Sequence, residues 1–111
     1  MNIHDKAREL AQAIKGSGEF LQAKEAKQAI DADPDSKRML DDFRAKQLEL
    51  QSRLMTGERP AQEEMENMEK LYEVISLNLN IRRLMEAEKR LSVIFEDVQK
   101  ILGESLQELY K

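Results

Sequence analysis

The sequence contains no cysteine and no tryptophan, and its only histidine is His4. Without cysteine the chain cannot form disulfides, use a thiolate nucleophile or supply cysteine ligands to zinc or an iron–sulfur cluster. A single histidine cannot provide the two Glu-x-x-His motifs of a di-iron bundle, and we expect it to be solvated. Several classes of enzyme and metalloprotein are therefore excluded, and we expect no cofactor and no catalytic or metal site.

Long apolar runs are missing as well. No segment approaches the length of apolar sequence that spans a bilayer, and the first six residues lack the basic start and apolar stretch of a signal peptide. We therefore expect a cytoplasmic protein that does not associate with membranes.

Proline, glycine and aromatic residues are scarce, with two prolines, four glycines and 5% aromatics, whereas charged residues make up 36% of the 111 residues. This composition is typical of an all-α protein. A chain of this length forms one domain, residues 1–111, and buries only about two-thirds of its unfolded surface. The core should be modest, and a partner chain would help to stabilise it.

Capping residues and glycines divide the chain into five expected helices. Asn2 or Asp5 can cap the first helix, which should stop at Gly16, and Ser17 can cap a second helix over residues 18–32. These two helices should form a hairpin or a bent pair.

Asp33 followed by Pro34 marks the start of a third helix, because aspartate caps helices and proline suits the first helical position. We expect this helix over residues 34–56, a fourth from about residue 60, and a fifth over residues 81–102 that Asn80 caps and Gly103 ends. The short connections favour an antiparallel bundle of about five helices, in which the third to fifth are long.

Apolar residues in the second half of the chain recur with alternating spacings of three and four. Such spacing keeps them on one side of a helix, which must then be buried against another helix. One stripe comprises Ala61, Met65, Met68, Tyr72, Ile75 and Leu79, and a second comprises Leu84, Ala87, Leu91, Ile94, Val98 and Ile101. The third helix, earlier in the chain, carries a matching stripe of Leu40, Phe43, Gln47, Leu50 and Leu54, in which only Gln47 is polar.

Further apolar residues lie off these stripes, and a helix that packs on one neighbour does not need them. They are Leu48, Met55, Val74, Leu77, Met85 and Val93. We interpret part of this second surface as a contact with another copy of the chain. The residues expected to pack in self-association are Phe43, Leu50, Tyr72, Leu91 and Phe95.

Asp31, Asp33 and Asp35 imitate the first ligands of a calcium-binding EF-hand loop. The imitation stops there, because the sixth and twelfth positions hold Ser36 and Asp42 instead of glycine and glutamate. A capped turn between helices is the expected structure.

The net charge of −4 argues against direct binding of nucleic acid. The fifth helix nevertheless carries Arg82, Arg83, Lys89 and Arg90, which could contact RNA or an acidic partner. Interleaved acidic residues favour a mixed surface, and no set of aromatics is present for base stacking.

Two segments carry a family resemblance that covers nearly the whole chain. Residues 43–51 (FRAKQLELQ) with 54–57 (LMTG), and residues 84–92 (LMEAEKRLS) with 97–102 (DVQKIL), closely resemble the YlbF/YmcA family of small bacterial helical proteins, nearest to its YheA branch. The resemblance implies an all-helical, oligomeric, cytoplasmic protein.

The resemblance also implies non-enzymatic regulation. Better-studied relatives form a complex that influences RNA processing and carry cysteines that bind iron–sulfur clusters, which this chain lacks. The resulting hypothesis is a non-catalytic homodimer or higher oligomer that presents a surface to an unknown protein partner. The alternative is an RNA-associated accessory protein that uses the basic residues of the fifth helix.

Overall fold

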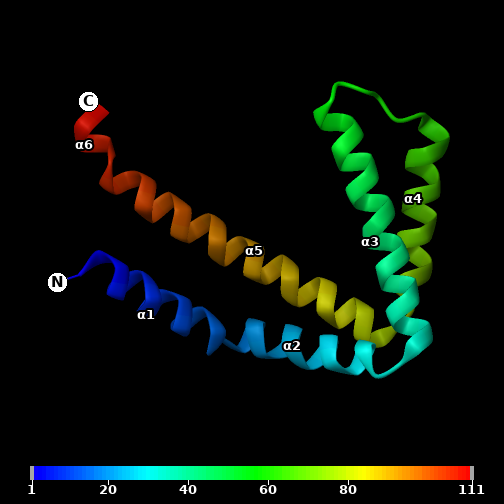
Figure 1. The fold of residues 1–111 in the computed structure, drawn as a ribbon, viewed down its shortest axis with the longest axis horizontal. Helices are drawn as coiled ribbons and strands as arrows, with labels where there is room; N and C mark the ends of the chain where they lie inside the picture. The colour runs from blue at the N-terminus through cyan, green and yellow to red at the C-terminus, as the bar shows by residue number, and fades with distance from the viewer. Residues whose placement is uncertain (1, 111) are drawn as a thin grey trace. The chain divides into compact units, whose positions relative to one another are not determined.

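The computed structural model describes residues 2–110, of which 86% are helical and none lie in strands (Figure 1). The all-α prediction is confirmed. The helices are α1 (Ile3–Lys15), α2 (Gly18–Asp31), α3 (Pro34–Met55), α4 (Gln62–Ile75), α5 (Leu79–Ser105) and α6 (Gln107–Tyr110).

The first three helices begin at the residues that the sequence predicts. The Asn2 side chain accepts a hydrogen bond from the backbone N–H of His4, and Ser17 accepts one from that of Phe20. Asp33 caps α3 through the backbone N–H of Asp35. Of the two expected arrangements of α1 and α2, a hairpin or a bent pair, the structure shows the bent pair (Figure 1).

The junction before α5 differs from the prediction that Asn80 is the cap. Asn78 caps α5 instead, because its side-chain oxygen accepts from the backbone N–H of Ile81 at 3.1 Å. Its amide nitrogen donates to the hydroxyl of the buried Ser36 at 2.7 Å, and that hydroxyl donates to Asp33. Hydrogen bonds therefore join the caps of α3 and α5, which makes position 78 the stronger cap.

The prediction that Gly103 ends the last long helix is also wrong. Helix α5 continues to Ser105, and only α6 follows it. Glycine favours a helix end where the backbone adopts a positive φ, and Gly103 does not do so, whereas Gly57 has a φ of 87° just after α3.

The chain forms two compact units. One unit spans residues 26–83 and contains α3 and α4, which run antiparallel side by side (Figure 1). Its buried apolar side chains are Ala26, Ile30, Leu40, Phe43, Ile75 and Ile81. The expected stripes of the third and fourth helices thus supply much of this core.

The other unit combines the chain up to Glu25 with the chain from Leu84 onward. Within it α5 runs in the direction opposite to α1 (Figure 1), and Arg90 donates a hydrogen bond to Gln22 at 3.4 Å. Leu84 and Ala87 are its buried apolar residues, and no residue of α1 is buried.

Candidate interaction surfaces

The core is small compared with the apolar surface that remains in contact with solvent. Eight apolar residues are buried in the described chain, whereas eighteen large apolar side chains are exposed. The largest exposures are those of Ile3, Met55, Leu77 and Tyr110, which lie at helix ends or in a connection between helices. Much of the apolar surface predicted by the helical stripes is therefore not covered within one chain.

Two of the five predicted packing residues meet between α3 and α4. Phe43 is buried, and its ring centroid lies 6.0 Å from that of Tyr72. Tyr72 itself is 50% exposed, so one side of its ring packs on Phe43 and the rest faces solvent. Leu50 is half-buried and lies further along α3.

The other two predicted packing residues lie on α5. Leu91 is half-buried, and Phe95, one turn further on, is 51% exposed. Beyond them Ile101 and Leu102 are also exposed. The stripe of α5 is thus buried at Leu84 and Ala87 and becomes accessible from Leu91 onward.

The four basic residues predicted to contact RNA or an acidic partner are all exposed on α5. Helical geometry separates them into two pairs, because each residue turns the helix by about 100°. Arg83 and Arg90 lie beside the apolar stripe, whereas Arg82 and Lys89 lie on the side opposite Leu91. They do not form one basic face.

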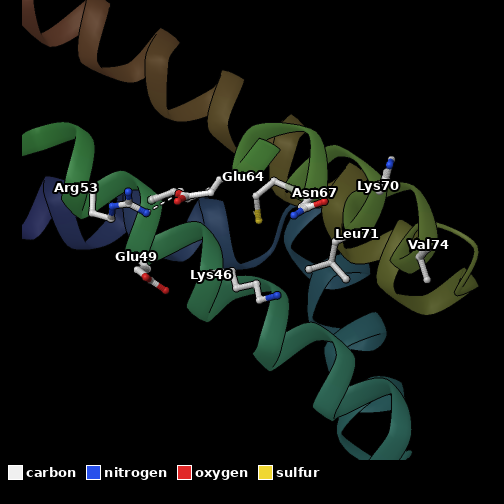
Figure 2. A pocket seen from close by; sticks show the side chains of 10 residues that line it. Lys46, Glu49, Arg53, Glu64, Asn67, Lys70, Leu71 and Val74 are labelled. Carbon is white, nitrogen blue, oxygen red and sulfur yellow. Dashed lines mark hydrogen bonds and ion pairs between the residues drawn. The ribbon is translucent and has the colours of Figure 1, made fainter. Parts of the chain in front are cut away.

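A groove between α3 and α4 was missed at the sequence level. It has a volume of about 480 Å³ and is lined from α3 by Lys46, Glu49, Leu50 and Arg53, and from α4 by Glu64, Asn67, Met68, Lys70, Leu71 and Val74 (Figure 2). Leu50, Met68, Leu71 and Val74 make part of the lining apolar, and charged groups surround it. The signal in the sequence was a second set of three-and-four spacings, offset from the main stripes.

Arg53 closes one end of this groove. Its guanidinium forms ion pairs with Glu64 on α4 and with Glu58 in the connection, the latter at 2.9 Å (Figure 2 shows the Glu64 pair). The hydrogen bonds that Arg53 donates to Glu64 and then to Glu58 raise the pKa of Arg53 above its ordinary value. The group therefore stays charged and acts as a fixed link between the two helices.

The aspartates that imitate a calcium loop have local structural roles. Asp31 pairs with Lys27 at 2.6 Å and Asp35 pairs with Arg38 at 3.0 Å, while Asp33 caps α3. Over residues 2–110 no group of three or more histidine, aspartate or glutamate side chains is placed to hold a metal ion. No helix in that range is both long and apolar enough to cross a membrane.

These features define a class, that of small all-α proteins with amphipathic helices and extensive uncovered apolar surface. The chain belongs to the family described as "Control of competence regulator ComK, YlbF/YmcA", which matches residues 3–107. The predicted resemblance to this family is confirmed, and the family description links it to the control of a regulator.

Similar proteins extend over almost the whole chain. A UPF0342 protein of Alkalihalophilus pseudofirmus is 44% identical over 109 residues, which cover 98% of this chain and 92% of the relative. A UPF0342 protein of Bacillus licheniformis is 40% identical over 110 residues, covering 99% and 94%.

Two solved structures share the fold. A protein of unknown function (DUF964) from Bacillus stearothermophilus superimposes with a TM-score of 0.86 at 33% identity, covering 98% of this chain and 96% of that one. YheA from Bacillus subtilis superimposes with a TM-score of 0.71 at 30% identity, covering 98% and 99%.

Proposed function

We propose that this protein is a non-catalytic, cytoplasmic interaction protein that self-associates as a homodimer or higher oligomer and presents a helical surface to a protein partner. The observation that carries the proposal is the excess of exposed over buried large apolar side chains in the described chain. Monomeric proteins rarely expose contiguous apolar patches larger than about a few hundred Å², and larger patches mark interaction sites.

Helix α1 supports the proposal independently. It is 13 residues long and has one apolar face, which includes Ile3, Leu10 and Ile14, yet none of its residues is buried. A helix of that length is only marginally stable in water without tertiary contacts. A second chain that covers this face supplies the missing stabilisation.

The α3–α4 groove supports the second half of the proposal. Its apolar lining and charged surround suit the apolar side chains of an amphipathic helix from a protein partner. The family description, which concerns control of a regulator, is consistent with a protein partner.

Measurement of the mass in solution tests self-association. We expect light scattering at micromolar concentration to give at least twice the 12.9 kDa of one chain. Because Phe95 is half-exposed in the single chain, Phe95→Asp should keep the helical circular dichroism and lower the mass to that of a monomer.

Val93→Asp provides the matched control, because Val93 is an exposed apolar residue (52%) on the side of the same helix opposite Phe95 and receives the same charge. It should leave the mass unchanged. A wild-type mass of one chain at these concentrations would refute the self-association proposal.

A further inference from the structure

Helix α5 is electrically polarised along its length. Residues 79–91 contain four basic and two acidic side chains, whereas residues 92–105 contain three acidic and one basic. Arg83 and Arg90 in the first part and Asp97 and Glu104 in the second are all exposed. The helix therefore has a positive first half and a negative second half.

This polarity is opposite to the one that stabilises an isolated helix. The helix dipole favours acidic groups near the start and basic groups near the end. Helix α5 has no acidic residue in its first turn and no basic residue in its last turn. The arrangement disfavours the helix alone, so it indicates a partner of complementary charge.

The same four residues are spaced by seven. Three of them directly precede a member of the apolar stripe: Arg83 precedes Leu84, Arg90 precedes Leu91 and Asp97 precedes Val98. Glu104 continues the series seven residues further on. In the heptad notation of coiled coils, the stripe occupies positions a and d and these four residues occupy position g. Charges at this position determine the partner and the orientation of paired helices.

We propose that α5 pairs antiparallel with α5 of a second copy of the chain, an inference that rests on the self-association proposed above and specifies its surface. The pairing brings Arg90 of each copy to Asp97 of the other, and Arg83 to Glu104. A parallel pair instead aligns the positive halves with each other and the negative halves with each other. Charge complementarity therefore selects both the occupant and its direction.

The apolar contact lies at the centre of the helix. An antiparallel register that pairs the charges also places Leu91 opposite Ile94 of the second copy, with Phe95 beside them. Leu91 and Ile94 are half-buried and Phe95 is half-exposed in one chain, so they have surface left to cover. Leu84 and Ala87 are already buried within one chain. Away from the centre, the two helices are therefore held together by the pairs between Arg83 and Glu104.

Distances between single labels, one on each copy of the chain, test the geometry. The chain has no native cysteine, so Ser92→Cys or Ser105→Cys gives one labelling site per copy. A nitroxide label is attached at this site in both copies. With a rise of 1.5 Å per residue and interaxial distances near 10 Å, the backbones of the two labelled residues should lie roughly 10–15 Å apart for position 92 and ~40 Å apart for position 105.

Each outcome of the distance measurement is decisive. A short distance at 92 with a long one at 105 supports the antiparallel pair. Two other outcomes overturn the antiparallel pairing but leave self-association standing. One is an equally short distance at both positions, and the other is a long distance at position 92 in a protein that is dimeric by mass. A monomer by mass overturns both.

Charge reversal tests the role of the flanking residues. The double variant Arg83→Glu/Arg90→Glu should weaken dimerisation by roughly ten-fold or more, because four attractive contacts become repulsive. Adding Asp97→Arg and Glu104→Arg restores the complementarity and should restore the dimer. Failure of this rescue contradicts the proposed register.

Arg82→Glu/Lys89→Glu is the matched control, since it makes the same change in net charge on the opposite side of the helix. It should leave dimerisation within about two-fold of the wild type. Two results together would overturn the pairing and support the RNA-associated alternative instead. The first is equal weakening of dimerisation by both double variants. The second is salt-sensitive binding of a single-stranded RNA oligonucleotide that needs all four basic residues.

Discussion

At the scale of single residues, Ser36 is the one buried polar residue of the described chain, and its environment explains why it is tolerated. Its hydroxyl accepts from Asn78 and donates to Asp33, so its hydrogen-bonding capacity is used within the core. The same hydroxyl links the start of α3 to the start of α5. The sequence predicted Asp33 as a cap but gave no signal for Ser36, because residues 36 and 78 meet only in the folded chain.

Ser36→Ala should therefore destabilise the protein by about 1–3 kcal/mol, because the amide of Asn78 loses its acceptor in a part-buried position. Urea unfolding followed by circular dichroism at a fixed chain concentration measures the change. Ser52→Ala, at an exposed position of α3, is the control and should stay within ~0.5 kcal/mol. Equal effects of the two variants would contradict the bridging role of Ser36.

The Lys27–Asp31 pair makes a prediction about pH. The hydrogen bond from Lys27 lowers the pKa of Asp31 below its ordinary value of 3.8. A lowered folded-state pKa stabilises the protein above pH 3.8, and this contribution is lost as the pH falls through the folded-state value. Lys27→Gln should raise the pKa of Asp31 toward 3.8.

The pKa of Asp31 can be followed through its carboxyl carbon by NMR titration. Lys24→Gln, on the same helix but outside the pair, should leave the titration curve unchanged. A curve for Lys27→Gln that coincides with the wild type would show that the pair does not persist in solution.

At the scale of helices, local signals determined most boundaries. Asn2, Ser17 and Asp33 cap the helices that the sequence assigned to them, because capping is a bond between residues two or three apart. The two wrong boundaries have different causes: Asn78 offers a cap equivalent to Asn80, and the backbone of Gly103 does not adopt the positive φ that favours a helix end. At the first of them a distant residue, Ser36, decides between Asn78 and Asn80.

The glycines provide an element-scale prediction. Gly103 lies inside α5 with no atom crowding the position of a Cβ, so Gly103→Ala should stabilise the protein by ~0.5–1 kcal/mol. Gly57 has a positive φ, so Gly57→Ala should destabilise it by ~1 kcal/mol. Denaturant unfolding of both variants measures the two shifts, and shifts of the same sign would contradict these assignments.

At the scale of the whole molecule, the uncovered apolar surface makes stability depend on concentration. If folding and self-association are coupled, mass action raises the melting temperature as the chain concentration rises. We expect the midpoint to increase by several degrees between about 2 and 200 μM, as measured by calorimetry or circular dichroism.

Phe95→Asp is the reference for this experiment, because it should remove the dependence while the helical signal persists. A wild-type midpoint that is independent of concentration across this range would argue that the exposed residues contribute nothing to stability through association. It would count against the proposed function independently of which surface is involved.

The sequence by itself determined the all-α class, the family, most helix boundaries and the faces that need burial, since these follow from composition, caps and periodicity. Only the tertiary structure decided which members of a stripe are covered: Leu84 is buried and Phe95 is exposed although both belong to the apolar side of α5. Periodicity defines a face but not the neighbour that covers it. The α3–α4 groove and the link through Ser36 depend on how distant segments pack. For that reason the sequence predicted an assembly protein, and the structure specified the surfaces through which assembly can be tested.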